Sequence, residues 1–265
     1  MQTKIAKLFS SLAILLFFAS IGLRLAMLLL NLGNISVVFY YITVALGILA
    51  VSLETIDTKK YANAFIFKNN FHLNIFAYIA SLGFFIDFVH LCITAFGSIE
   101  NGEYKQLIFF VPVCLSALFA LMSCFYFYTI GMSYGDKNYD FRELKILHLA
   151  PIGWAVSQAL TVMQQSISFM IDIDSVIKYL LLIFCVLFFY FFATEIESDK
   201  PAKSETLIFA RGLYYIGALF LANRLMLVLS RNADIGNDDG LLSVSIFLIA
   251  VFVFFFEKNT LSHKA

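Results

Sequence analysis

Charged residues are scarce in this chain, and their shortage excludes two broad classes of protein. Only 14% of the 265 residues are charged, and 18 basic side chains are balanced by 18 acidic ones. A soluble domain carries about 25% charged residues, and a nucleic-acid-binding protein needs a surplus of positive charge. We therefore expect neither a separate soluble domain nor a nucleic-acid partner.

Proline is rare as well, with only Pro112, Pro151 and Pro201 in the whole chain. The first two fall near the start of apolar segments, where the missing N–H costs little, and the third falls in a polar stretch. Helices broken near the membrane midplane are the usual sign of a transport site. That sign is missing here, which weakens a transporter interpretation without excluding it.

Motifs that would indicate a reaction or a cofactor are missing too. The chain has no glycine-rich phosphate loop, no HExxH and no CxxC. Asp87 and His90 lack a third ligand that would complete a metal site, so we expect no metal and no cofactor. Four cysteines lie in apolar runs, where a free thiol acts as a small apolar group; they are Cys92, Cys114, Cys124 and Cys185. Among them, Cys92 and Cys114 are the pair best placed for a disulfide.

Apolar residues, in contrast, make up 61% of the chain, and its mean hydropathy is +0.87. A membrane-spanning helix needs roughly 20 mostly apolar residues, and eight segments qualify. They are 8–32, 35–53, 74–97, 107–131, 146–171, 175–194, 206–230 and 240–256. The sequence therefore predicts an all-α fold, a polytopic transmembrane bundle of eight helices that forms a single membrane domain over residues 1–265.

Two further features concern the organisation of this domain. The first segment begins like a signal peptide, but its apolar run continues to Leu32, so we expect a retained helix. Cleavage there would leave seven helices. Residues 78–87 align loosely with residues 215–224, which suggests a weak four-plus-four helix repeat of 1–140 and 141–265.

The distribution of lysine and arginine predicts the orientation of the bundle. Most of these residues fall in alternate loops and at both termini, whereas only Lys105, Lys178 and Arg231 fall on the opposite side. Cytoplasmic loops carry the excess of basic residues. We therefore predict a multi-pass protein of the cell membrane, plasma or inner, with both termini in the cytoplasm.

Polar side chains inside the apolar segments are concentrated in the first, third, fifth and seventh of them. Because residues three and four apart share a helix face, these side chains form stripes, and polar stripes avoid lipid. We therefore expect these four helices to form an inner set. The candidate substrate-binding residues on them are Arg24, Asp87, His90, Gln158, Gln164, Gln165, Asn223 and Arg224.

The depths of these residues suggest a single polar site in the outer half of the membrane. At 1.5 Å per residue, Arg24, Asp87 and Arg224 lie at similar depths. Two arginines and one aspartate leave an excess positive charge, which a small anionic or polar solute would balance. Two alternatives remain open: a structural network in which Asp87 meets either arginine, and arginines that extend to the headgroups.

Three functions remain open on this evidence. The first is a transporter or channel for a small solute or ion, which uses the polar site. The second is a membrane sensor, or a subunit that binds another membrane protein through the apolar sixth and eighth helices. The third, an intramembrane enzyme acting on a lipid-type substrate, would need Asp87 and His90 as acid and base. We assign no catalytic residue, and the lipid bilayer is the one partner common to all three.

Overall fold

The structure, a computed structural model, describes residues 4–30, 34–58, 71–100, 107–135, 145–168, 173–198, 204–229 and 238–262. All of the described residues are helical, which confirms the predicted all-α class for this part of the chain. A 3-10 helix, Lys145–Leu149, leads into α5. The eight α-helices are α1 Lys4–Leu30, α2 Asn34–Thr58, α3 Phe71–Glu100, α4 Leu107–Gly135, α5 Ala150–Ser168, α6 Ile173–Ser198, α7 Ser204–Leu229 and α8 Asp238–Ser262.

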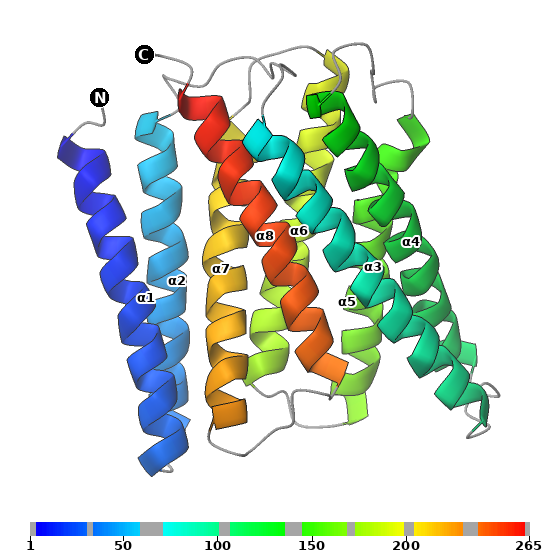
Figure 1. Ribbon diagram of the computed structural model, residues 1–265. Coiled ribbons are helices and arrows are strands. Elements are labelled where there is room, and N and C mark those ends of the chain that lie inside the picture. Colours follow the sequence, from blue (N-terminus) through cyan, green and yellow to red (C-terminus); the bar gives the residue numbers. More distant parts are fainter. Residues whose placement is uncertain are drawn as a thin grey trace.

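Length and composition make this bundle suited to a membrane. Among the described residues, six helices are long and apolar enough to cross one, namely α1, α2, α3, α4, α6 and α7. The 25 residues of α8 and the 19 of α5 correspond to about 37 Å and about 28 Å of helix, and both run beside the others (Figure 1). Large apolar side chains such as Leu8, Leu15 and Phe18 of α1 are more than 60% exposed, which hydrocarbon tolerates and water does not.

The two ends of the bundle can be told apart by the chain termini. Helix α1 begins and α8 ends at the same end, drawn at the top of Figure 1. We call this the terminal end, and the opposite one the distal end. Consequently the odd-numbered helices run from the terminal end to the distal end, and the even-numbered helices run back.

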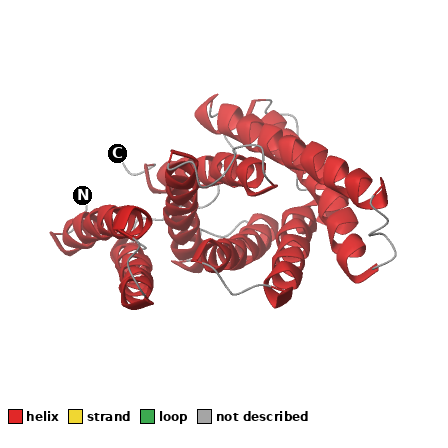
Figure 2. Ribbon diagram, turned by 90° about the horizontal axis from the view of Figure 1, so that it is seen from below, coloured by secondary structure: helices red, strands yellow, loops and turns green. Residues whose placement is uncertain are grey.

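Helices α3 to α8 form a closed ring, and α1 and α2 form a hairpin outside it. In the ring each helix packs on the next one in the sequence, and α8 returns to α3. The hairpin contacts the ring mainly through α7 (Figure 2). The expected inner set of the first, third, fifth and seventh helices is therefore not formed. Only 22% of the most apolar stretch of α1 is buried, against 44% for α6.

Phenylalanine rings fill the interior of the ring of helices. The ring of Phe127 on α4 lies 5.2 Å from Phe84 on α3, 5.8 Å from Phe189 on α6 and 5.0 Å from Phe252 on α8, measured between centroids. All four side chains are fully or almost fully buried. Phenylalanines of α6 and α8 thus contribute to the core of the ring. This explains why these two helices, which have few polar side chains, are buried in the bundle.

The four cysteines are free thiols, as expected. The best-placed pair, Cys92 and Cys114, forms no disulfide. Cys124 contributes to packing through its backbone instead, because Ser81 on α3 donates a hydrogen bond of 2.9 Å to the Cys124 carbonyl on α4.

The phenylalanine core predicts a large difference between two residues of one helix. Phe127 is 0% exposed, whereas Phe125, two positions earlier on α4, is 56% exposed. Phe127→Ala leaves a cavity and should cost about 3 kcal/mol or more of unfolding free energy, while Phe125→Ala should cost much less. Denaturation of the purified protein in detergent micelles measures both, and equal losses would contradict a core at this position.

Candidate functional site

Polar residues follow one another along the surface where α1 and α2 meet α7. We call this surface the hairpin interface. Ionic and hydrogen-bonding groups occur near its distal end, in its middle and near its terminal end, and a cavity lies between the last two. The three groups are described in that order.

The distal group neutralises the arginine of α1. Arg24 is 9% exposed, and its Nη2 lies 2.8 Å from Oδ2 of Asp174 on α6. Beside this pair, Asn223 on α7 donates a hydrogen bond of 2.6 Å to the hydroxyl of Tyr40 on α2. Both links join the hairpin to the ring. Asp174 stands in the first turn of α6, where a carboxylate also interacts favourably with the helix dipole.

The middle group closes the interface at half depth. Ser20 Oγ on α1 lies 3.2 Å from Thr43 Oγ1 on α2, which ties the hairpin together. Tyr215 extends from α7 to the hairpin, where its hydroxyl lies against Gly47. A Cβ atom at Gly47 would clash with that hydroxyl group, so a larger residue there would require the Tyr215 side chain to move. Tyr215 itself is 6% exposed, and its hydroxyl has no hydrogen-bond partner among the described residues.

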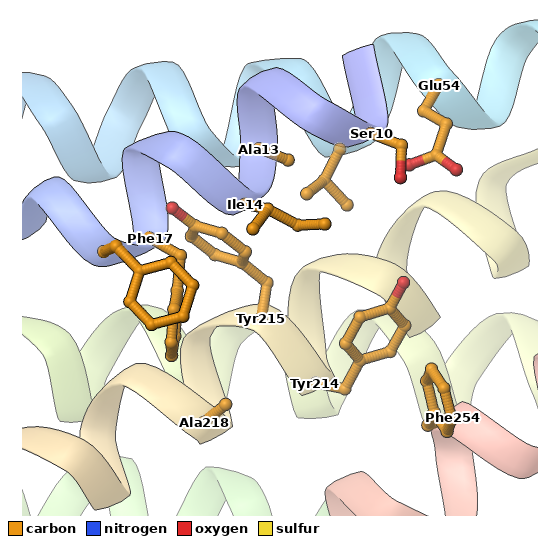
Figure 3. Close-up of a pocket in the computed structure, with 11 residues that line it drawn as sticks. Ser10, Ala13, Ile14, Phe17, Glu54, Tyr214, Tyr215, Ala218 and Phe254 are labelled. Atoms are coloured by element: carbon orange, nitrogen blue, oxygen red, sulfur yellow. The ribbon is translucent and has the colours of Figure 1, made fainter. Parts of the chain in front are cut away.

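A cavity of about 390 Å³ lies between Tyr215 and the terminal end. Side chains of α1, α2, α7 and α8 line it, and most of them are apolar or aromatic (Figure 3). Its polar lining comes from Ser10, Glu54, Tyr214 and Tyr215. Because ligand pockets have volumes of about 300–1,000 Å³ and are mainly apolar with a few polar groups, this cavity has the size and character of a binding site.

The terminal group is a buried ion triad across three helices. Arg211 on α7 donates from Nε to Oε1 of Glu257 on α8 at 2.5 Å, and its Nη1 lies 3.3 Å from Oε1 of Glu54 on α2. All three residues are buried. Two carboxylates share one guanidinium, so with both ionised the triad has a net charge of −1. Of the two carboxylates, Glu54 lies farther from the guanidinium, and it is the one that lines the cavity.

The sequence did not indicate this triad. Arg211, Glu54 and Glu257 lie within two turns of the helix ends at one side of the bundle, where charges usually reach solvent or headgroups. A signal was nevertheless present, because all three lie at similar depth on the basic side. Opposite charges at equal depth on different helices are candidates for pairing.

Asp87 belongs to a separate network inside the ring. It is 0% exposed, and its Oδ2 accepts hydrogen bonds of 2.7 Å from Trp154 Nε1 and 3.3 Å from Gln158 Nε2, both on α5. Electrostatic interactions also link it to His90 on α3 and Lys178 on α6. The network joins α3, α5 and α6, and no cavity described here reaches it. Arg24 is paired with Asp174 and not with Asp87, so the alternative network in which Asp87 meets Arg24 is not formed.

The predicted single cluster is therefore divided. Arg24 and Asn223 lie at the hairpin interface, whereas Asp87, His90 and Gln158 lie in the ring network. Arg224 follows Asn223 on α7 and is partly buried. The side chains of Gln164 and Gln165 lie outside the described residues. Within the described ranges, no three of the His, Cys, Asp and Glu side chains come close enough to hold a metal ion.

Comparison with known proteins adds no assignment, because no protein-family model, curated protein or solved structure matches the chain.

Two glycines test the fit of Tyr215 against the hairpin. Gly47→Ala places a methyl group on the buried Tyr215 ring and should destabilise the protein and separate the hairpin from α7. Gly22→Ala on α1 meets nothing within 4 Å and should be neutral or slightly stabilising, because alanine is the better helix former by about 1 kcal/mol. Thermal unfolding in detergent compares the two variants. Similar melting temperatures of the two variants would show that Tyr215 is not packed closely against Gly47.

A double-mutant cycle tests the ring network. Asp87→Asn and Trp154→Phe each weaken the hydrogen bond between α3 and α5, so the second change should cost little once the first is made. We expect a coupling free energy of about 1 kcal/mol or more, obtained from chemical denaturation of the four proteins. Additive losses would mean that the two side chains do not interact.

Proposed function

We propose that the chain is a membrane transporter that moves a small solute along the hairpin interface. In this proposal all eight helices span the cell membrane, and the terminal end, where most lysines and arginines lie, faces the cytoplasm. The single observation that carries the proposal is a ligand-sized cavity that lies in one interface between two ion-paired groups. Ionisable residues within membrane spans are costly and rare, and solute pathways are one of the functions that they mark.

Continuity of the polar groups supports this path. From the distal end it runs through Arg24 and Asp174, past Ser20 and Thr43, to Tyr215, the cavity and Glu54. Inside the ring, in contrast, Phe84, Phe127 and Phe252 pack closely against one another. A solute would accordingly move beside the ring and not through it.

The arrangement of the interface favours a carrier over a channel. Tyr215 is packed against Gly47 and lies between the cavity and the distal group, as expected of a carrier in which the cavity is closed on one side. A carrier requires one part of the protein to move against another. The hairpin is suited to be the moving part, because α7 provides most of its contacts with the ring.

In this mechanism the cavity opens alternately towards the distal side and towards the terminal side. A solute binds in the cavity while Arg24–Asp174 and Tyr40–Asn223 hold the distal side shut. Rocking of the hairpin separates these pairs and opens the cavity towards the distal side, while the terminal halves of α1 and α2 close on α7. Loss of the Arg24–Asp174 ion pair should therefore favour the state that is open on the distal side.

Thiol labelling tests this mechanism without knowledge of the solute. A variant without native cysteines carries Ser10→Cys in the cavity lining, and a membrane-impermeant maleimide is added to the distal side of sealed vesicles. We expect slow labelling that accelerates several-fold when Asp174→Asn removes the ion pair. The charge-exchanged double variant Arg24→Asp with Asp174→Arg serves as the control and should restore slow labelling.

Two outcomes would count against the proposal. Labelling that never occurs from the distal side, with or without Asp174→Asn, would mean that the cavity has access to one side only. Equal labelling rates in all three proteins would mean that the ion pair does not control access.

A further inference from the structure

We propose that the ring network around Asp87 is a proton site that controls the distal side of the hairpin interface. The proton would thus be the coupling ion of the transporter, so this inference rests on the proposed function and deepens it. Three observations carry it: the hydrogen bonds of Asp87, the position of Lys178 near two carboxylates, and the ion pair that the second carboxylate forms with the hairpin.

The two oxygens of the Asp87 carboxyl group have different surroundings. Trp154 Nε1 and Gln158 Nε2 both donate to Oδ2, at 2.7 Å and 3.3 Å. The other oxygen, Oδ1, is buried and has no hydrogen-bond partner among the described residues. A proton that binds to Oδ1 would therefore break neither of these hydrogen bonds, and Oδ2 would keep both donors. The network can thus hold the carboxyl group in its charged and in its neutral form.

The burial of Asp87 makes its charge depend on a few neighbours. The side chain is 0% exposed, and an ionised carboxylate away from water is costly unless a cation compensates it. The titratable side chains that interact with it electrostatically are His90, on the same helix, and Lys178 on α6. Within their bounds α4 and α5 contain no acidic residue, lysine, arginine or histidine, and those of α8 lie near its two ends. Among the described helices, compensation of ionised Asp87 therefore comes from His90 and Lys178.

Lys178 also lies close to a second carboxylate, on its own helix. Asp174 precedes it by four residues on α6, and side chains at this spacing are neighbours on one helix face. Asp174 is the residue that binds Arg24 of the hairpin, at 2.8 Å. Opposite charges thus alternate from the hairpin into the ring, in the order Arg24, Asp174, Lys178 and Asp87. Among these four residues, positive and negative charges balance as long as Asp87 is ionised.

Proton uptake by Asp87 would disturb this balance. With Asp87 neutral, Lys178 and Arg24 would compete for the Asp174 carboxylate, because two cations would then share one anion. Weaker binding of Arg24 releases the distal end of the hairpin, so the proton should favour the state that is open on the distal side. His90 lies one helical turn nearer the distal end than Asp87 and is partly exposed, which gives the proton an approach from that side.

Difference infrared spectroscopy of the full-length protein in lipid nanodiscs tests proton binding directly. Acidification should produce carbonyl stretching bands of protonated carboxyl groups, and one of these bands should be absent in Asp87→Asn. Glu195→Gln is the matched control, because Glu195 is also 0% exposed and accepts a hydrogen bond from Thr206. It should leave the band of Asp87 in place. Identical bands in the native protein and in Asp87→Asn would overturn the proton site.

Thiol labelling measures the effect of the proton on the hairpin. The Ser10→Cys variant is labelled from the distal side, and its rate is divided by that of the same variant with Asp174→Asn, which cancels the effect of pH on the maleimide reaction itself. We expect this ratio to rise several-fold from mildly alkaline to mildly acidic pH. Asp87→Asn should raise it at alkaline pH and remove its dependence on pH. A ratio that is the same at every pH would contradict control by a proton.

Removal of Lys178 separates competition between cations from a general loosening of the ring. Asp87→Asn combined with Lys178→Gln removes the competitor of Arg24, so labelling should return to the slow rate. Asp87→Asn combined with Lys258→Gln, an exposed lysine at the terminal end, should remain fast. Equally fast labelling of both double variants would overturn the competition. If Asp87→Asn fails to fold, Lys178→Gln alone keeps the test decisive, because it should abolish the rise at acidic pH in a protein that retains Asp87.

The outcomes distinguish this inference from the transport proposal. Faster labelling in Asp174→Asn, with no effect of pH or of Asp87→Asn, would support the hairpin mechanism and contradict the proton site. An infrared band of Asp87 without faster labelling in Asp174→Asn would support proton binding, and would contradict both the hairpin mechanism and its control by the proton.

Discussion

Pairing of buried charges across helices is the constraint on which the arrangement of this protein depends. A charge at the depth of Arg24 or Arg211 is costly in hydrocarbon unless a partner neutralises it. No acidic residue of α1 lies within reach of Arg24, so its partner, Asp174, comes from α6. In the same way Arg211 of α7 binds carboxylates of α2 and α8. These ion pairs connect the hairpin to the ring near the distal end and near the terminal end. Between the two ends, the hairpin interface consists of hydroxyl groups and the cavity.

The protein thus contains two kinds of interior with different physical properties. The ring is held by interlocking phenylalanines and by the network around Asp87, and a packed aromatic core resists deformation because its contacts are lost together. The hairpin interface instead contains hydroxyls, ion pairs and unfilled space. Without a hydrophobic force to drive helices together in lipid, such polar contacts and close packing decide which helices associate. An interface of this composition can separate and close again at lower cost than the ring core.

Hydropathy was sufficient to predict the helices but not their neighbours. All eight apolar segments became helices at the expected places, because the hydrogen bonds of a helix are local. The burial of each helix could not be predicted in this way. The polar stripe of α1 faces α2, α7 and, through Arg24, Asp174 of α6, while the apolar helices α6 and α8 are buried against other apolar helices. In a membrane protein an apolar face fits both lipid and a core, so the composition of α8 could not show where Phe252 lies. Asp174 could not be predicted as the partner of Arg24, because the expected sixth segment begins at residue 175, whereas α6 begins at Ile173 and includes Asp174 in its first turn.

The central claim is that the hairpin rocks against a rigid ring. Distances between spin labels at exposed positions measure this directly by pulsed electron paramagnetic resonance in lipid nanodiscs. One pair, on Leu29 of α1 and Phe96 of α3, reports on the distal end, and a second pair, on Ile5 and Phe71 of the same helices, reports on the terminal end. The account predicts a second population in which the distal distance is longer and the terminal distance shorter, and predicts that Asp174→Asn increases it. A single unchanged distance for each pair, in the native protein and in the variant, would contradict it.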